Sequence, residues 1–481
     1  MKKRLIALIL TAALVILSVA ALAACGPKNS ETELNVVCLN KGYGKEWIED
    51  IAAKFEADHP GYTVNLQATA SASTLISRNI TSRNNVDDVY ISVGADWLKY
   101  ARQGLFANLD DIMDDEIDGV TLKNKVSSEY QNSILYPDRT GALHTYRLPW
   151  VAATGGIFYN QKMFEEQGWE VPATYDELVT LCQTIIDSAV DVPSSDGGLK
   201  TVAPFVYTSA NPDYFDYTVY TWWAQLAGEE AIREFTLYKS ADNYDVTKSD
   251  TYRKLQTATE MWYDLFKNPA NVTVGVSNDD AQLKFAKGEA AMMFSGDWMY
   301  NEIANYDLNS DKFELGIMKT PAANGAVDSD ILYTIGEDQY IAIPESSIKK
   351  DLAKDFVKLI VSDYGCKTFL NKAHGLLAYN CDYTNATTDK FMNNLIETRN
   401  SYTTRFTDYP TMPKDGSTEN VLTSTRMLYL AGSLTFWSQA SLRPYGDLLN
   451  VKGYTIETAF ATIATETANS WAQNMSNLGL K

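Results

Sequence analysis

The sequence lacks the residue patterns of the common catalytic and metal-binding sites. It has three histidines, His59, His144 and His374, which stand far from one another. Neither a Gly-x-x-x-x-Gly-Lys phosphate-binding loop nor a Gly-x-Ser-x-Gly nucleophile turn occurs. We therefore expect no histidine-based metal site, no metal ion and no cofactor.

Cysteines are few. After Cys25 they are Cys38, Cys182, Cys366 and Cys381. These positions are too far apart for a zinc-binding spacing, and they indicate no redox function. Cys366 and Cys381 could form one disulfide in an extracytoplasmic protein, but four free, partly buried thiols is the interpretation that we favour.

Basic residues are outnumbered. The chain has 41 Lys and Arg against 61 Asp and Glu, a formal net charge of −20 at pH 7. Such an acidic surface repels nucleic acid and anionic lipid, so neither is an expected partner. With 45% hydrophobic and 21% charged residues the composition is that of a soluble globular protein.

The one long apolar run begins the chain. Residues 1–4 carry three positive charges, residues 5–22 are almost wholly apolar, and Leu22-Ala23-Ala24-Cys25 follows. A transmembrane anchor is an alternative, because the run nearly reaches the ~20 residues that span a bilayer. The small residues before a cysteine instead resemble the lipobox of bacterial lipoproteins. We predict a signal peptide over 1–24, a lipid on Cys25, a tether over 25–33, and a lipid-anchored extracytoplasmic protein.

The remainder, about 450 residues, is too long for one hydrophobic core. Residues 34–39 and 62–66 read as strands around a helix at 45–59, whose buried face would hold Trp47, Ile48, Ile51, Ala52 and Phe55. Residues 86–93 predict a third strand. Residues 96–103 predict a short helix that ends at Gly104. The chain therefore begins as an α/β protein with parallel strands.

Helix caps and hydrophobic spacing predict further helices and strands in the rest of the chain. Thr174 stands three residues before Glu177, which is the capping-box spacing at a helix start. A helix at 279–287 should end at Gly288, before a strand at 290–294. Amphipathic helices are expected at 347–361 and 455–475. No Pro-, Gly- or Ser-rich linker divides the chain, so any crossing between domains must be short.

Aromatic residues are abundant, with 29 Tyr, 17 Phe and 10 Trp. Several tryptophans stand in turn-like contexts, among them Trp97 after Asp96, Trp298 after Asp297, and Trp222 in a tyrosine-rich stretch. An aromatic ring offers a flat apolar platform for the C–H face of a sugar. The alternative is that a given tryptophan is simply part of the core.

Four segments in order, residues 88–106, 149–160, 285–298 and 340–356, resemble the extracellular solute-binding proteins of ABC transporters. They match the carbohydrate-binding, maltose-binding-protein-like family. The resemblance implies a type II periplasmic-binding-protein-like fold, in which two α/β lobes close on a ligand by a hinge motion.

Matching segments place the crossings between lobes near residues 151–154, 335–340 and 373–379. The N-terminal lobe would then hold residues 34–151 and 340–372. The C-terminal lobe would hold residues 155–334 and 380–481.

The resemblance also implies site residues. Trp298 and Trp437 match sugar-stacking tryptophans of the family, and Asn40, Lys41, Tyr43, Asp213 and Tyr214 fall in segments where the family contacts its ligand. Beside these, we expect ligand contacts from Asp96, Trp97, Trp150, Trp222 and Asp297. The chain departs from maltose-binding protein at Ala153, Ser92 and Ala95, where that protein has ligand-contacting acidic or aromatic residues. We therefore expect the ligand to be recognised differently from maltodextrin.

The function implied is capture of an oligosaccharide and its delivery to a membrane permease, by a protein that is not an enzyme and is expected to be a monomer. One alternative is a surface-anchored glycoside hydrolase with Glu337 and Asp338 as its carboxylate pair. Neighbouring residues of a strand point to opposite faces, which argues against that pair. Another alternative is a cationic ligand such as a polyamine, which acidic and aromatic residues could both attract.

Overall fold

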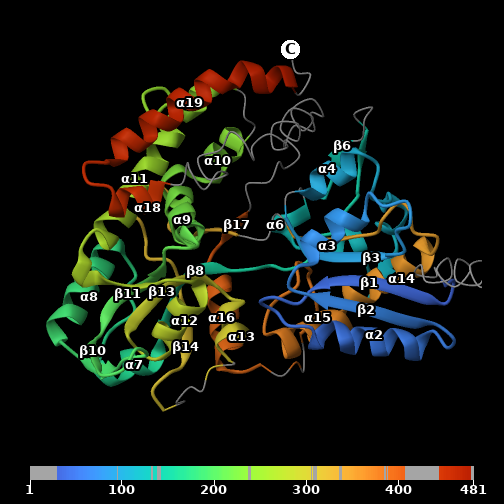
Figure 1. The fold of residues 1–481 in the computed structure, drawn as a ribbon, viewed down its shortest axis with the longest axis horizontal. Coiled ribbons are helices and arrows are strands. Elements are labelled where there is room, and N and C mark those ends of the chain that lie inside the picture. The colour runs from blue at the N-terminus through green and yellow to red at the C-terminus, as the bar shows by residue number, and fades with distance from the viewer. Residues whose placement is uncertain are drawn as a thin grey trace, which may run out of the picture.

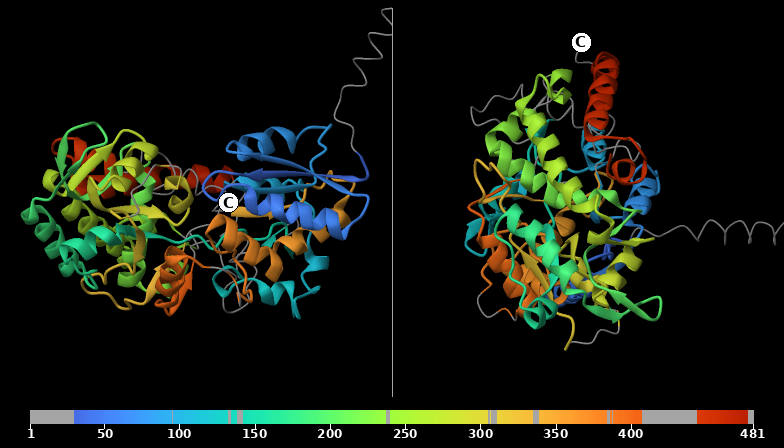
Figure 2. Two further views of the ribbon diagram at one scale, coloured as in Figure 1. Left: turned by 90° about the horizontal axis from the view of Figure 1, so that it is seen from below. Right: turned by 90° about the vertical axis from the view of Figure 1, so that its left-hand side faces the viewer.

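The computed structural model describes residues 30–94, 96–131, 134–137, 142–236, 240–304, 306, 311–334, 339–383, 386, 388–406 and 444–477. These residues form two α/β lobes that lie side by side, each built around its own sheet (Figures 1 and 2). We name as the N-terminal lobe the described residues of 30–152 and 339–383, which include the strands of one sheet. We name as the C-terminal lobe those of 155–334 and 386–477, which include the strands of the other.

The N-terminal lobe has a four-stranded sheet in the order β16-β3-β1-β2. Its strands are β1 (Glu33–Leu39), β2 (Thr63–Thr69), β3 (Val89–Val93) and β16 (Gln339–Ala342). Strands β2 and β3 are parallel to β1, whereas β16 is antiparallel to β3. The predicted parallel β-α-β start of the chain is confirmed.

Helices cover both faces of this sheet. They are α2 (Glu46–Asp58), α14 (Lys350–Ile360) and α15 (Asp363–Ala373) on one face, and α3 (Ala72–Asn79) and α4 (Asp96–Arg102) on the other. Side chains alternate along β1, since Val36 and Cys38 pack toward the first group and Val37 toward the second. All five residues predicted for the buried face of α2 are buried. Burial of these apolar faces on both sides explains why the parallel sheet is stable.

The C-terminal lobe has a five-stranded sheet in the order β12-β11-β13-β8-β14. The strands are β8 (Gly155–Asn160), β11 (Ala203–Thr208), β12 (Val272–Gly275), β13 (Ala290–Gly296) and β14 (Leu315–Met318). Its helices are α7 (Gln161–Gln167), α8 (Tyr175–Ser188), α9 (Asp216–Ala227), α10 (Glu229–Thr236), α11 (Asp250–Phe266), α12 (Asn278–Ala286), α13 (Met299–Ile303), α16 (Lys390–Asn400), α18 (Pro444–Asn450) and α19 (Ile456–Asn477).

Short elements complete the described chain. They are β4 (Glu116–Ile117), β5 (Val120–Thr121), α5 (Leu122–Lys125), α6 (Ser128–Gln131), β6 (Tyr136–Pro137), β7 (Leu143–His144), β9 (Asp191–Pro193), β10 (Leu199–Thr201), β15 (Ile331–Tyr333), β17 (Thr404–Phe406) and the 3₁₀ helices η1 (Asp110–Ile112), η2 (Pro212–Phe215), η3 (Ala241–Tyr244) and η4 (Pro269–Asn271). No helix in the described part of the chain is both long and apolar enough to cross a bilayer.

Local sequence signals set several boundaries as expected. The Thr174 hydroxyl accepts from the Glu177 N–H at 3.3 Å, and the Glu177 carboxylate accepts from the Thr174 N–H at 3.2 Å, which confirms the capping box. Helix α12 ends before Gly288, whose φ of +81° suits glycine. Helix α14 begins three residues later than predicted, because the Ser347 hydroxyl instead bonds the Asp88 carboxylate and receives the Lys349 N–H.

The segments that join the lobes pair with each other. The Ala152 N–H donates to the Leu376 carbonyl at 2.8 Å, and the Ala378 N–H to the Trp150 carbonyl at 2.9 Å. From this pair the chain enters the C-terminal lobe through β8 (Figure 1). Leu377, Ala378 and Tyr379 belong to the buried cluster of the N-terminal lobe.

Arg399 of α16 fixes the same region from the C-terminal lobe. Its guanidinium donates to the Ala152 carbonyl at 3.1 Å, the Thr154 hydroxyl at 2.7 Å and the Glu129 carboxylate at 2.8 Å. Because Glu129 belongs to the N-terminal lobe, this buried ion pair spans the two lobes beside the crossing strands.

One cysteine interpretation is wrong. Cys366 of α15 and Cys381 form a disulfide, with 6.3 Å between their Cα atoms, in place of the four free thiols that we expect from the sequence. The fold brings them together because residues 376–379 double back against the N-terminal lobe. Cys38 and Cys182 are free and buried, and burial raises the pKa of the Cys182 thiol to about 12.

Candidate functional site

A cavity of about 320 Å³ lies between the two lobes. Leu39, Ala70 and Val93 line it, and they stand at or just after the carboxyl ends of β1, β2 and β3. The carboxyl edge of a parallel sheet is the usual place for a ligand site in α/β proteins. The other lining residues are Lys41, Gly42, Tyr43, Ser73, Trp150 and Gln339 of the N-terminal lobe and Tyr214, Tyr217, Trp298 and Glu302 of the C-terminal lobe.

Trp298 presents its ring to this cavity. It follows β13 and precedes α13, and it remains partly exposed. Two tyrosines hold it edge-on, with ring centroids at 6.0 Å for Tyr214 and 5.5 Å for Tyr217. The indole folds back over Gly296, where a Cβ would clash with the outer ring atoms, so a larger residue there would displace the indole. These contacts orient the indole.

Tyr43 and Asp297 meet at the edge of the cavity. The Tyr43 hydroxyl donates to Asp297 Oδ1 at 2.7 Å, and the Asp297 N–H donates to the Thr154 carbonyl at 3.0 Å. Burial raises the pKa of Asp297 to about 6, against the opposing effects of the Tyr43 hydrogen bond and the Arg399 charge. Burial, together with the Asp297 charge, raises the pKa of Tyr43 well above its ordinary value.

Among the described residues that line the cavity, the charged ones are Lys41 and Glu302. They come from opposite lobes. Burial raises the pKa of Glu302, while a hydrogen bond from Gln282 Nε2 at 2.6 Å and the charge of Lys41 act in the other direction. The lining thus offers one cationic donor and one acidic acceptor, beside the amide of Gln339.

The structure brings together a subset of the residues expected from sequence. Lys41, Tyr43, Trp150, Tyr214 and Trp298 all line the cavity, and the buried Asp297 bonds the lining residue Tyr43. Asn40 and Asp213 are sequence neighbours of lining residues but do not line the cavity themselves. Trp437 and Cys25 lie outside the described residues.

Two of the expected tryptophans are in the lobe cores. Trp97 is fully buried in α4, edge-on to Tyr136 at 4.3 Å, with the Arg147 guanidinium 4.4 Å above its ring. Asp96 begins the same helix. Trp222 is fully buried in α9, and its Nε1 donates to the Pro321 carbonyl at 2.9 Å. Neither tryptophan lines the cavity, so the structure gives both a packing role.

Several lining residues are not among those expected from sequence, including Tyr217, Glu302 and Gln339. Tyr217 stands three residues after Tyr214, so a helical spacing in that aromatic stretch could have indicated it. Glu302 stands four residues, one helical turn, after Trp298. Gln339 has no local signal, because its position depends on the antiparallel pairing of β16 with β3.

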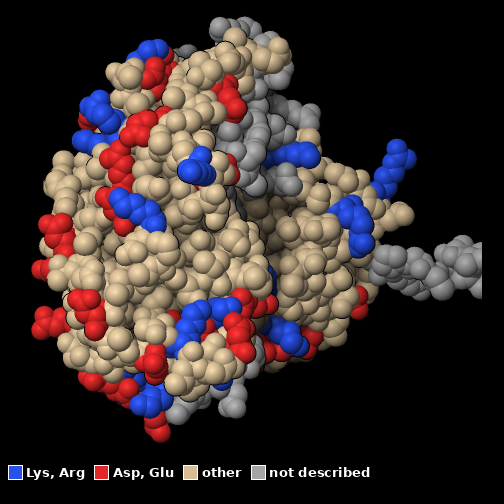
Figure 3. Space-filling view, turned by 60° about the vertical axis from the view of Figure 1, so that its left-hand side comes forward, with Lys and Arg blue, Asp and Glu red and all other residues tan. Residues whose placement is uncertain are grey.

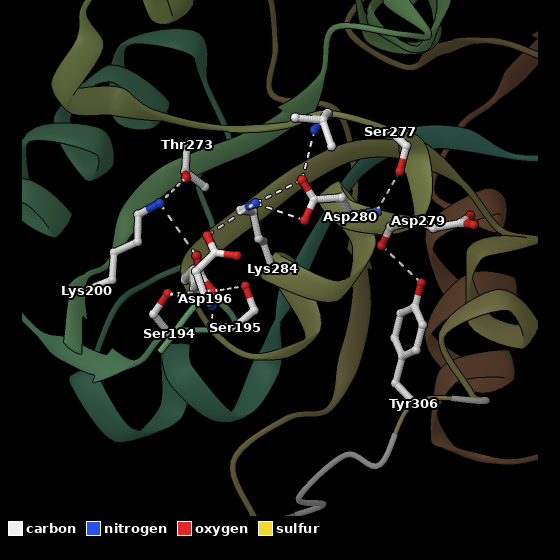
Figure 4. A network of polar contacts seen from close by, with 12 residues as sticks. Ser194, Ser195, Asp196, Lys200, Thr273, Ser277, Asp279, Asp280, Lys284 and Tyr306 are labelled. Carbon is white, nitrogen blue, oxygen red and sulfur yellow. Dashed lines mark hydrogen bonds and ion pairs between the residues drawn. The ribbon is translucent and has the colours of Figure 1, made fainter. Parts of the chain in front are cut away.

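Other polar clusters lie elsewhere. Figure 4 shows Lys200 and Lys284 among serine and aspartate side chains near the β9–β10 hairpin. There the buried Glu289 accepts from the Ser195 N–H at 2.5 Å and lies 3.5 Å from Lys200 Nζ. Glu289 precedes β13 at the end opposite Asp297, so these contacts hold the hairpin rather than form part of the cavity. Within the described residues no group of three His, Cys, Asp or Glu side chains could hold a metal ion.

A second hollow, of about 400 Å³, lies on the N-terminal lobe. Its lining is rich in amide side chains, including Asn35, Asn65 and Asn79, and has no aromatic residue among those described. On the face shown in Figure 3, acidic and basic side chains stand close together rather than in a field of one sign.

Two hinged α/β lobes with a ligand cavity between them define a solute-binding protein of the type II periplasmic-binding fold. Residues 41–364 match the family described as "Bacterial extracellular solute-binding protein". The chain belongs to this family, which confirms the maltose-binding-protein-like resemblance.

Two relatives are similar to this chain in sequence, and one solved structure is similar to it in fold. The chain is 23% identical over 280 residues to the Multiple sugar-binding protein of Streptococcus mutans, a match that spans 57% of this chain and 59% of that protein. It is 24% identical over 397 residues to the Diacetylchitobiose binding protein DasA of Streptomyces coelicolor, covering 78% of this chain and 82% of that one. The fold matches the sugar-binding protein MalE from Xanthomonas citri with a TM-score of 0.65 at 14% identity, over 94% of this chain and 100% of that one.

Proposed function

We propose that this protein is the substrate-binding lipoprotein of an ABC importer, and that it captures an oligosaccharide between its lobes for delivery to a membrane permease. The observation that carries the proposal is Trp298, a partly exposed indole held edge-on by Tyr214 and Tyr217 and facing the interlobe cavity. One face of a sugar ring is apolar, and an aromatic platform is its complement. The sugar's hydroxyls point outward from the ring edge.

Those hydroxyls find polar partners around the same cavity. For a sugar ring stacked on Trp298, Glu302 of the C-terminal lobe would be a hydrogen-bond acceptor and Lys41 of the N-terminal lobe a donor. Hydroxyl groups can use both. At about 320 Å³ the cavity is at the lower end of the ~300–1,000 Å³ usual for ligand pockets. We therefore expect it to accept one or two sugar rings, or the end of a longer oligosaccharide.

The names of the relatives support this ligand class. One is a multiple sugar-binding protein and another binds diacetylchitobiose. Both names describe binding of a solute, as does the description of the family.

A cationic ligand remains the second candidate, because aromatic rings also bind cations. Lys41 counts against it. An ammonium group near Glu302 would meet the Lys41 charge across the cavity, which a neutral sugar does not. A glycoside hydrolase needs two carboxyl groups ~5–9.5 Å apart at the scissile bond. Glu302 is the one carboxylate among the described lining residues. Glu337 and Asp338 lie outside the described residues.

Anchoring is proposed at Cys25. The described chain begins at Ser30, whose carbonyl accepts from Lys349 Nζ at 3.0 Å, and the same amine donates to the Glu33 carbonyl at 2.6 Å. Lys349 is itself buried and paired with Asp88 at 2.9 Å. These contacts fix Ser30 and Glu33 on the N-terminal lobe, and Ser30 is five residues after Cys25 in the sequence. A lipid on Cys25 would hold the lobe near the membrane that contains the permease.

A thermal-shift panel tests the ligand class. Purified protein that lacks residues 1–25 is melted alone and with mono- and oligosaccharides, polyamines or short peptides. A ligand that binds only the folded state raises the melting temperature by mass action. We expect a saccharide to do so. A shift with polyamines and none with any saccharide would overturn the proposal.

A further inference from the structure

One of the contacts between the two lobes involves two consecutive residues on each side. Gly42 and Tyr43 belong to the loop after β1, and Asp297 and Trp298 follow β13. Tyr43 bonds Asp297, and a Cβ placed on Gly42 would lie 3.0 Å from Trp298 Cβ. The φ of Gly42 is +81°, a second reason for glycine at this position.

Tyr43 is rigidly part of the N-terminal lobe. Its ring is 5.9 Å from that of Trp150 and 5.3 Å from that of Phe369, and it is 4% exposed. Asp297 directly follows the central strand β13 of the C-terminal lobe and is fully buried, and its N–H donates to the Thr154 carbonyl of the crossing segment at 3.0 Å. The bond between them therefore joins the two lobes beside the crossing segment.

We propose that Tyr43 and Asp297 form an interlobe latch, which holds Trp298 in its ligand-facing position and slows the escape of a bound ligand. The proposal rests on the binding function proposed above. A hydrogen bond to a buried carboxylate is among the stronger polar contacts in proteins. Hinge opening breaks it, so its free energy favours the closed state. Since Asp297 directly precedes Trp298, the same bond also orients the backbone that carries the indole.

The latch predicts a kinetic effect that a purely structural role would not give. Tyr43→Phe keeps the ring packing and removes the hydroxyl. With a saccharide that binds the wild type, we expect the dissociation rate constant to rise at least about tenfold, while the association rate constant changes little. Tyr175→Phe is the matched control, because it removes a buried hydroxyl that bonds the Met261 carbonyl at 2.8 Å within one lobe. Stopped-flow kinetics should show no change for this control.

A double-mutant cycle isolates the contact. Tyr43→Phe, Asp297→Ala and the double variant are compared by calorimetric titration, beside thermal melting to verify folding. If the latch exists, the loss of affinity in the double variant is much smaller than the sum of the two single losses. Additive losses, or an unchanged dissociation rate in Tyr43→Phe, would overturn the latch and leave sugar binding intact.

Failure of the proposed function gives a different pattern. If no saccharide binds the wild type, small-angle scattering of the ligand-free proteins tests the latch by itself. A larger radius of gyration in Tyr43→Phe than in wild type and Tyr175→Phe would support it. Equal radii would count against it.

Discussion

Replacement of Trp298 by alanine separates a ligand platform from a core residue. A tryptophan buries ~150–250 Å² in total, so one face offers roughly 80–100 Å² to a sugar ring. At ~25 cal/mol per Å² that face contributes about 2 kcal/mol to binding, or about a 30-fold change in Kd. Because Trp298 is partly exposed at the cavity, the loss of folding stability should stay below that of a fully buried tryptophan.

Trp222→Ala is the control in the same lobe. It removes a fully buried side chain and leaves the Pro321 carbonyl without its 2.9 Å donor. We expect a loss of ~3–5 kcal/mol in the free energy of unfolding, with normal affinity in the folded fraction. Calorimetric titration with a saccharide identified in the thermal-shift panel, beside chemical denaturation, gives both quantities. Unchanged affinity in a well-folded Trp298→Ala protein would refute the stacking role.

Three further predictions concern charge, the disulfide and the anchor. The pKa of Asp297 in the folded protein is about 6 instead of 3.8. The free energy of unfolding is therefore highest below about pH 4, where the carboxyl is protonated, and falls by about 3 kcal/mol as the pH rises through 6. The melting temperature of Asp297→Asn should therefore exceed that of wild type most at pH 8 and hardly at pH 4; a constant difference would contradict this. Removing the Cys366–Cys381 disulfide, which closes a separation of 15 residues, should lower the stability by about 3 kcal/mol, measured by denaturation of Cys366→Ser/Cys381→Ser; no loss would show that the link is not formed. Cys25→Ser should release the protein into the medium or leave it uncleaved, with an unchanged melting curve; normal processing and membrane retention would exclude the lipobox.

Much of the fold could be predicted because its signals are local. The capping box at Thr174, the glycine after α12 and the buried face of α2 each depend on spacing within one or two helical turns. The pairing of β16 with β3 and the doubling back that joins Cys366 to Cys381 depend on contacts between distant segments. No local pattern encodes them.

The site was harder to predict for the same reason. Trp97, Trp222 and Trp298 have similar local contexts, yet only Trp298 faces the cavity. The difference arises from the strand that each follows and the helices that cover it. Lys41 and Tyr43 could be expected from the family resemblance, whereas Glu302 and Gln339 reach the cavity through tertiary structure alone.

The central claim is that a saccharide is held against Trp298 between the lobes. A crystal structure of the complex with the saccharide that gives the largest thermal shift tests it most directly. The account predicts a sugar ring with its C–H face parallel to the Trp298 indole, its hydroxyls within hydrogen-bond distance of Lys41 or Glu302, and the Tyr43–Asp297 bond intact. A saccharide bound elsewhere, for example in the amide-lined hollow at Asn35 and Asn65, with the interlobe cavity holding only water, would contradict it.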